Sequence, residues 1–346
     1  MRFSTAAFVV CALVAPVGSV GCGGGSAPLS PTLPQTSAAP GAPATTSRTF
    51  EGQTESAPDA TFLAGISVTL GTLQATSNAS GFFTVENAAA GTTSIDLTGP
   101  SIVDRHTDVR VPSGGVVRFG LIPSSFDLAA YNEMFRGSHD RLQRWIGAPS
   151  LVVLTSVMKF ENSEATTAEA TGEQMAPGEV DSMIRDLTGG LAALTANTFT
   201  AFAQVTREST GVGARARFNR NNQIVVARFR DLRTATGSVG FGRWAERDDG
   251  VVTGGVMFLD GSYDATSEKR KLRTHELGHA LGYKHVTIRT SIMNPVLGSD
   301  LTDFDRQGAS IAFQRPVGNR APDFDPAGSV RPLTAGGDAH WVPSVP

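Results

Sequence analysis

Cysteine is almost missing from this chain of 346 residues, which contains only Cys11 and Cys22. Both lie in or directly after an apolar run at the N-terminus. The long remainder therefore has no cysteine to form an intramolecular disulfide or to bind a metal as a thiolate. We expect its stability to come from packing, helped by any ions that it binds.

Charge is also scarce, and neither sign dominates. Charged residues make up 18% of the chain and the formal net charge is −3. A nucleic-acid-binding protein needs a basic face, so this balance argues against a nucleic-acid partner. The N-terminal apolar run, Ala6–Val17, is too short for a membrane-spanning helix, which needs about 20 residues. We expect a monomer that meets a membrane only through an N-terminal lipid.

The N-terminus reads as an export signal. One positive charge at Arg2, the apolar run and then small residues form the three parts of a secretory signal peptide over residues 1–21. The run from Ser19 to Cys22 resembles a bacterial lipobox, with Ser19 where that pattern prefers Leu, and this implies lipidation of Cys22. Residues 22–47 are rich in Gly, Pro, Ser and Thr and predict a flexible tether. The expected location is the outer membrane or cell surface; ordinary cleavage after the small residues, giving a secreted form, stays open.

Residues 48–122 show short runs of alternating apolar and polar residues, as at Ile66–Leu70. Gly and Asn clusters interrupt these runs every 8–12 residues or so, which predicts a small all-β sandwich. The stretch from Gly65 to Val85, with Gly81-Phe82 after a polar turn, resembles the transthyretin-like (carboxypeptidase-regulatory-like) modules of bacterial surface proteins. The resemblance implies a spacer or interaction module. His106 we interpret as a surface residue.

From residue 123 to residue 316 the pattern changes. Apolar residues at helical spacing predict an amphipathic helix over Glu179–Thr195, and Ser150–Leu154, Gln223–Phe229 and Gly255–Leu259 predict strands. The polar, Thr-rich segment from Glu161 to Ala176 predicts a loop. Helices alternating with strands indicate an α/β or α+β layered domain. Residues 317–346, rich in Pro, Gly and Asp, predict an extended or disordered tail.

The most informative segment begins at His275. His275 and His279 are four residues apart, so on a helix both imidazoles face one point, and Glu276 is rotated toward a water on a metal. Gly282 can end the helix in a left-handed conformation and return His285 as a third ligand. Three neutral nitrogens leave a fourth position open, which is typical of one catalytic zinc ion. The alternative is a helix whose histidines are unrelated to metal, and three such histidines would be costly to leave unpaired.

Met293 lies eight residues after His285, in a short turn closed by Pro295. With the histidine motif, this spacing resembles the metzincin clan of zinc peptidases and is most similar to the matrixins. The resemblance implies a twisted mixed sheet with packed helices, one of them carrying the active site, and an apolar floor at Met293. It also places Val252–Leu259 as the edge strand along which an extended protein or peptide substrate binds. On its own, Met293 would be an ordinary core residue.

Two features of the matrixins are not found here. The cysteine that keeps matrixin precursors latent is absent, so the enzyme is either made active or blocked by another segment. Structural metal sites are not assignable. Asp248, Asp249 and Asp260 are candidate calcium ligands with a solvated loop as the alternative, and the spare histidines His139 and His340 read as surface residues.

The sequence therefore predicts metal-assisted peptide hydrolysis with Glu276 as the general base. The rivals are a catalytically silent surface-binding or adhesin lipoprotein, and a structural zinc domain. The second lacks a fourth protein ligand near His285. Specificity would depend on the pocket around Val296 and Leu297, and the natural substrate cannot be derived from these residues.

Overall fold

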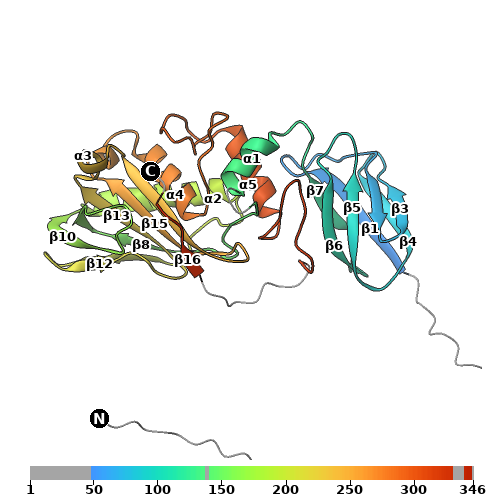
Figure 1. Cartoon of the computed structure of the whole chain (residues 1–346), viewed down its shortest axis with the longest axis horizontal. Coiled ribbons are helices and arrows are strands. Elements are labelled where there is room, and N and C mark those ends of the chain that lie inside the picture. The colour runs from blue at the N-terminus through green and yellow to red at the C-terminus, as the bar shows by residue number, and fades with distance from the viewer. Residues whose placement is uncertain (1–47, 137–139, 330–338, 345–346) are drawn as a thin grey trace, which may run out of the picture. The chain divides into compact units, whose positions relative to one another are not determined.

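The computed structural model describes residues 48–136, 140–329 and 339–344 (Figure 1). The predicted signal peptide, the tether with Cys22, and His139 lie outside the described residues. No helix within the described ranges is both long and apolar enough to cross a membrane.

The N-terminal strands form two small antiparallel-rich sheets around one core. The three-stranded sheet has the order β4-β1-β7 and the four-stranded sheet the order β3-β2-β5-β6. The strands are β1 (Arg48–Ser56), β2 (Ser67–Leu70), β3 (Leu73–Thr76), β4 (Phe82–Ala88), β5 (Gly91–Thr98), β6 (Arg105–Val111) and β7 (Val117–Leu121). Alternate residues of both sheets point into the shared core, as the alternating sequence pattern predicts. Phe50, Phe83 and Phe119 meet there with ring centroids 5.9–6.4 Å apart.

The rest of the chain is organised around a nine-stranded mixed sheet. Its main path has the order β12-β10-β9-β13-β15-β14-β16, and β8 pairs with β13 and β11. The strands are β8 (Ser150–Leu154), β9 (Ser156–Lys159), β10 (Thr167–Gln174), β11 (Val205–Glu208), β12 (Arg215–Arg217), β13 (Gln223–Arg230), β14 (Gly240–Arg247), β15 (Val252–Asp260) and β16 (Ala339–Trp341). Strand β13 is parallel to β8 and β15, whereas β14 is antiparallel to β15.

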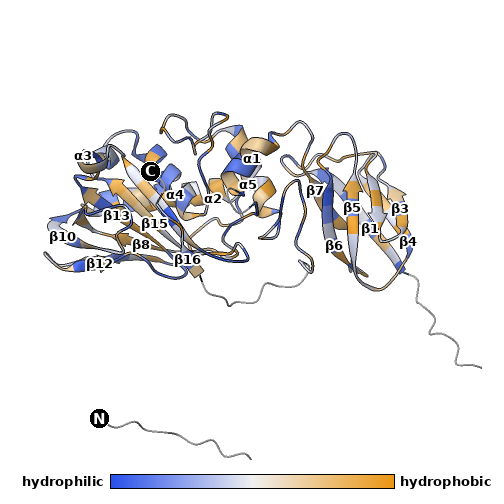
Figure 2. Cartoon of the chain, in the orientation of Figure 1, coloured by the Kyte–Doolittle hydropathy of each residue, from blue (hydrophilic) through white to orange (hydrophobic). Residues whose placement is uncertain are grey.

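The central strands of this sheet are buried on both faces, which explains their continuous apolar runs (Figure 2). On one face, alternate residues such as Val153, Val226 and Met257 pack against helices. On the other face, residues such as Val225 and Phe258 share a core with β9, β10 and β12 of the same sheet. One layer is therefore helix on sheet, and the other is sheet on sheet.

Helices connect the strands and cover the first face. They are α1 (Leu128–Phe135), α2 (Pro177–Leu194), α3 (Leu232–Thr236), the 3₁₀ turn η2 (Tyr263–Ala265), α4 (Lys269–Ala280) and α5 (Asp303–Phe313). Helix α4 packs against β14 and β15, and α2 packs against α4. Helix α2 carries Pro177 at its start, where a missing N–H costs nothing, and Thr302 caps α5 by accepting from the Asp305 amide at 3.3 Å.

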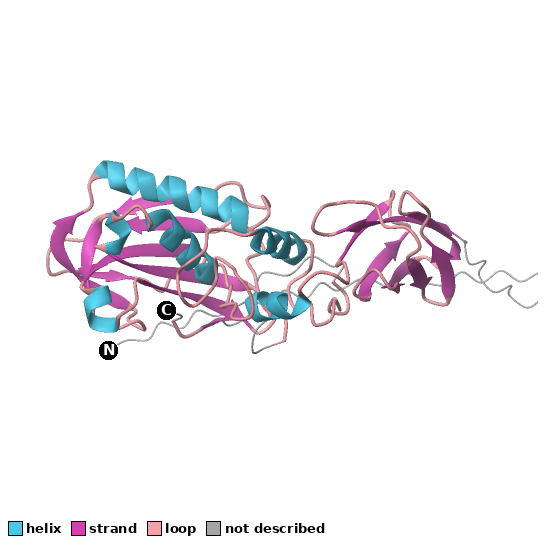
Figure 3. Cartoon of the chain, turned by 90° about the horizontal axis from the view of Figure 1, so that it is seen from above, coloured by secondary structure: helices cyan, strands magenta, loops and turns pink. Residues whose placement is uncertain are grey.

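The predicted fold class, an α/β or α+β metzincin domain plus a small β sandwich, is wrong. The described residues form sixteen strands in three sheets against five α-helices, so the chain is mostly β-sheet (Figure 3). The error is clearest at Glu161–Ala176, which was predicted as a loop. Strand β10 occupies residues Thr167–Gln174, and its Ala168 and Ala170 are buried in the sheet-on-sheet core. Alternating Thr, Ala and Glu are compatible with a half-buried strand, but their low apolar content does not distinguish this segment from a polar loop in the sequence.

The predicted edge strand also needs correction. Strand β15, which contains Val252–Leu259, lies inside the sheet between β13 and β14. The strand beyond it is β14, which begins at Gly240. Part of the predicted tail is packed as well: Asn319 and Asp323 are buried, and Asn319 Nδ2 donates to Asp323 Oδ1 at 3.0 Å.

Candidate metal centre

Helix α4 brings two of the three predicted ligands to one face. His275 and His279 lie one turn apart on it and are buried. The helix ends at Ala280, and Gly282 two residues later has a φ of +98°, the left-handed conformation that glycine adopts without strain. The Tyr283 amide then donates back to the Gly278 carbonyl at 2.9 Å, which closes the helix end and turns the chain toward His285.

The three imidazoles converge on one point through the same ring atom. His279 Nε2 lies 3.1 Å from His275 Nε2 and 3.2 Å from His285 Nε2. One ligand nitrogen from each of the three rings lies within 4.8 Å of the other two. Among the described residues, this is the one cluster of three or more His, Cys, Asp or Glu side chains with such geometry.

The opposite nitrogens of two rings are held by backbone carbonyls. His275 Nδ1 is 2.7 Å from the Ile292 carbonyl oxygen, and His279 Nδ1 is 2.8 Å from that of Tyr283. A carbonyl only accepts, so each Nδ1 carries the proton and each Nε2 presents a lone pair. Burial lowers the pKa of His275 to about 4 and that of His279 well below its usual value, so both rings are neutral at neutral pH.

These observations fit a cation and not a hydrogen-bonded core. Two neutral nitrogens that both present lone pairs at 3.1 Å repel each other unless a positive ion lies between them. Neutral imidazole nitrogens, with the remaining ring nitrogens held by carbonyls, are the ligand arrangement that zinc takes in catalytic sites. The residues present therefore fit a zinc ion held by His275, His279 and His285.

Glu276 lies beside this cluster and is also buried. Its Oε2 has no hydrogen-bond partner in the described chain, and burial raises the pKa of its carboxyl well above the usual range. An unpaired buried carboxyl oxygen costs about 1–3 kcal/mol or more. Such a cost points to a ligand that this oxygen meets during function.

Two glycines of β14 let the helix approach the sheet at this point, and the sequence analysis missed their role. A Cβ on Gly240 would overlap the Glu276 carboxyl, and one on Gly242 would overlap the Cβ of His279. Only glycine fits at both positions. The signal was present in the sequence as two glycines spaced by the period of a strand.

Met293 and its turn lie directly beneath the helix. Met293 is fully buried, and a Cβ on Gly278 would overlap its sulfur. Asp305 of α5 holds the turn by accepting from the Ile292 amide at 3.0 Å. The Ile292 carbonyl in turn fixes His275, so Asp305 acts on the cluster through one intervening residue. This role of Asp305 depends on a tertiary contact and has no signal in the sequence.

A cavity of about 360 Å³ opens onto His275 and Glu276. Its other walls come from the segment before and into β14, from Tyr263 and Leu272, and from the segment that follows Met293; they include Gly237, Val239, Pro295, Val296 and Leu297. The walls are mainly apolar, with Glu276 as the acidic group. Pro295, Val296 and Leu297 thus lie where the sequence analysis expected specificity to be set.

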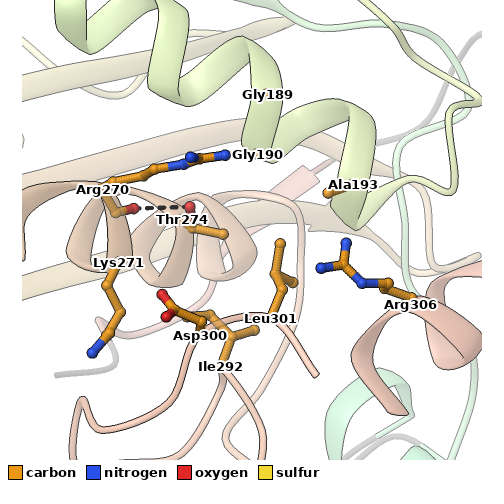
Figure 4. A pocket seen from close by; sticks show the side chains of 10 residues that line it. All are labelled: Gly189, Gly190, Ala193, Arg270, Lys271, Thr274, Ile292, Asp300, Leu301 and Arg306. Carbon is orange, nitrogen blue, oxygen red and sulfur yellow. Dashed lines mark hydrogen bonds between the residues drawn. The ribbon is translucent and has the colours of Figure 1, made fainter. Parts of the chain in front are cut away.

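A second cavity of about 310 Å³ lies against the other side of α4, between α2 and the start of α5 (Figure 4). Arg270, Lys271 and Arg306 line it, and the Thr274 hydroxyl donates to the Arg270 carbonyl at 2.9 Å. It contains none of the three histidines and not Glu276. We therefore place the chemistry in the first cavity.

A buried ionic cluster anchors the start of α4. Asp264 is fully buried, and its Oδ2 accepts from Arg228 Nη2 at 2.6 Å and from Arg273 Nη2 at 2.8 Å. Arg273 Nε donates to the other oxygen at 2.7 Å, and Arg273 Nη1 reaches Asp186 at 2.8 Å. Opposite charges meet on every side, so this cluster is complete without a ligand.

The candidate calcium ligands are not brought together. Asp249 accepts from its neighbour Arg247 and from the Val251 amide. Asp260 accepts from the amides of Ser262 and Arg233. The protein's own donors therefore occupy these carboxylate oxygens. The spare histidine His340 lies on β16, with Nε2 3.6 Å from Glu246 Oε1.

Comparisons with known proteins do not identify the chain. No protein-family model matches it, and no curated protein matches it. A chain of a type II cohesin–X-dockerin complex from Acetivibrio cellulolyticus is 22% identical over 21% of this chain and 51% of that one, with a TM-score of 0.17. The Bacillus anthracis TIE protein is 8% identical over 60% of this chain and 41% of that one, with a TM-score of 0.19. The chain thus spans about half or less of these two structures, and likenesses of this size carry no argument about fold or function.

Proposed function

We propose that the chain is a zinc-dependent endopeptidase that uses His275, His279 and His285 as metal ligands and Glu276 as general base. One observation carries the proposal: the lone-pair nitrogens His275 Nε2 and His279 Nε2 lie 3.1 Å apart, with His285 Nε2 3.2 Å from the second, beside a buried Glu276 oxygen that has no partner in the described chain. A structural zinc domain would need neither the unpaired carboxyl nor the adjoining cavity.

The chain's own groups supply most of the chemistry. When bound, zinc would polarise the scissile carbonyl and lower the pKa of a water toward about 7. Glu276 would take a proton from that water at Oε2 as the water oxygen adds to the scissile carbonyl carbon, and would pass it to the amine nitrogen as the C–N bond breaks. The carbonyls of Ile292 and Tyr283 hold the His275 and His279 rings in the ligating tautomer.

The substrate is a protein or peptide in extended conformation. Strand β14 passes beside Glu276 and His279, and the outer side of its first residues, Gly240 to Arg243, pairs with no strand of the described chain and could take an extended peptide. The apolar walls of the adjoining cavity suit an apolar side chain of that peptide. The resemblance to the metzincins is retained as a proposal for the segment His275–Pro295, without the fold class first expected from it.

Substitution of Glu276 tests this proposal. Glu276→Gln keeps the shape of the side chain and all three ligands, so the purified variant should hold as much zinc as the wild type. Its kcat/KM on unfolded casein should fall by about 10²–10⁴-fold, the usual contribution of a general base. Glu268→Gln, at the exposed start of the same helix, is the matched control and should cleave at the wild-type rate.

Two outcomes would count against the proposed function. Wild-type activity in Glu276→Gln would refute the assignment of the base. A wild type that holds zinc but cleaves neither casein nor a peptide library would favour the silent surface-binding lipoprotein.

Export and lipidation are a separate proposal: labelled palmitate should be incorporated by the wild type and not by Cys22→Ala, and equal labelling would overturn it.

A further inference from the structure

The outer edge of β14 is already partly occupied by the chain's own C-terminal strand. Strand β16 pairs with it antiparallel, with Ala339 opposite Arg247 and Trp341 opposite Ala245. The ladder continues one residue further, where the Val342 amide donates to the Trp244 carbonyl at 2.8 Å. The described C-terminal residues therefore lie along β14 in the direction an antiparallel peptide would take.

Side chains hold β16 in this position. Trp341 packs against the second core of the large sheet, and the Arg243 guanidinium lies 5.7 Å from its ring centroid. Beyond Pro343 the chain turns off the edge, where the Ser344 hydroxyl donates to the Ser163 carbonyl at 2.6 Å and the Ser344 amide to Glu164 Oε1 at 2.7 Å. The strand is thus docked by both backbone and side-chain contacts.

The register between β14 and β16 shows which part of the outer edge of β14 is not paired with β16. Trp244 directs its carbonyl outward to Val342, and backbone groups on one side of an antiparallel strand repeat every second residue. Gly242 and Gly240 therefore direct their N–H and C=O groups to the same side. These two glycines adjoin His279 and Glu276, and no strand of the described chain pairs with their outer side, so the unpaired part of the edge is the part next to the metal ligands.

The polarity of β14 then fixes which part of a substrate meets β16. A peptide antiparallel to β14 has its amino end toward Arg247 and its carboxyl end toward Gly240. From Gly242 to Trp244, only about two or three residues fit on the amino side of the reacting bond before Val342 is reached. Residues further toward the amino end would need the place that β16 occupies.

We infer that β16 sets the substrate class of this site: peptides with a short amino-side segment bind directly, and longer ones must first displace β16. This inference rests on the proposed function. It adds that the C-terminal strand competes with the amino-side part of an extended substrate for the outer edge of β14.

Two peptides and one double variant test the inference in the full chain. The fluorogenic peptides share the cleaved sequence and carry two or six residues on its amino side. Trp341→Ala with Val342→Pro removes the ring contact and the N–H that bonds to Trp244. The variant should raise kcat/KM for the long peptide about tenfold, as expected if the edge is open about a tenth of the time in the wild type, and leave the short peptide unchanged.

Two single variants bracket this result. Trp341→Phe keeps an aromatic ring on the sheet and should behave as the wild type with both peptides. Trp341→Ala alone is milder and should shift the long peptide in the same direction by a smaller factor, which covers the case of a poorly folding double variant. Equal rates for the long peptide in all variants, or equal changes for both peptides, would overturn the inference.

A binding measurement separates this inference from the proposed function. The probe is a fluorescein-labelled synthetic peptide of residues 337–346, followed by anisotropy with proteins that also carry Glu276→Gln. It should bind the double variant and not the protein with intact β16. If the probe binds the double variant but the wild type hydrolyses no peptide, the proposed peptidase is refuted and the competition at β14 stands. If the wild type hydrolyses both peptides equally well and the probe does not bind, only the competition is refuted. If there is neither hydrolysis nor binding of the probe, both proposals are refuted.

Discussion

Two buried polar clusters adjoin helix α4, and they differ in one respect. In the Asp264 cluster, the carboxylate accepts from Arg228 and Arg273, and Arg273 continues to Asp186. In the histidine cluster, the Nδ1 atoms of His275 and His279 are held by carbonyls, yet their Nε2 atoms face each other at 3.1 Å with lone pairs only. The first cluster is balanced by the chain, and the second is not.

The difference separates structure from function. Buried polar groups that are fully paired stabilise one arrangement of the chain, whereas unpaired ones carry a free-energy cost that a ligand can remove. Helix α4 combines the two: its first turns are fixed to β13 and α2 by the Asp264 cluster, and its last turn presents ligands and Glu276. The balanced cluster thus provides the rigidity that the unbalanced one needs.

Removing the centre of the balanced cluster should give the largest loss of stability. Asp264→Ala leaves two buried guanidinium groups without their shared partner, so we expect the free energy of unfolding to fall by about 3–5 kcal/mol. Urea unfolding measures it. Asp181→Ala, which breaks an exposed pair with Arg207, is the control and should cost no more than about 1 kcal/mol. A similar small loss for both variants would remove the contrast between the clusters.

Adding zinc should stabilise the folded chain through the histidine cluster and not through the Asp264 cluster. Zinc at about one hundred times its dissociation constant should raise the free energy of unfolding by about 2.7 kcal/mol, because the ion binds the folded chain. Calorimetric melting with zinc and then with a chelator checks it. His279→Ala should show no zinc effect. An equal zinc effect in this variant and in the wild type would contradict the assignment of the ligands.

Acid should weaken another balanced cluster, the one formed by Asp323 and Arg315. We expect this loss in the free energy of unfolding to be smaller than the two effects above. Burial works to raise the pKa of Asp323, but the neighbouring Arg315 guanidinium, 2.7 Å from each carboxylate oxygen, outweighs it and the pKa is lowered. A carboxyl with a lowered pKa stabilises the fold above its unfolded value near 3.9, and this contribution is lost as the pH falls through the folded value. Urea unfolding between pH 7 and pH 3 should show the loss, and Asp323→Asn should flatten that part of the profile. An unchanged profile in the variant would contradict this assignment.

The candidate site could be predicted from the sequence because its key spacings are local. His275 and His279 need only a helix, and His285 needs only the turn at Gly282. The structure brings all three together, and Met293 packs against Gly278 of the same helix. Gly240 and Gly242 could not be assigned in this way, because their importance depends on the approach of α4 to a strand some 35 residues earlier in the sequence.

The fold was harder to predict because sheet pairing is not local. The Thr-rich segment that forms β10 reads as a polar loop until its partners β9 and β12 are known. The same limitation placed the edge at β15 and not at β14. Strand β16 gave no signal at all, since three residues in a Pro- and Gly-rich stretch become a strand only through the edge that they meet.

The X-ray absorption spectrum of zinc in the purified protein tests the central claim most directly. If His275, His279 and His285 bind the ion, the zinc edge of an equimolar complex should show three imidazole nitrogens at about 2.0–2.1 Å and one further light atom. Glu276→Gln should give the same three nitrogens, and His279→Ala should lose the complex. A protein that binds no zinc, or a spectrum with fewer than three imidazole nitrogens, would contradict the account.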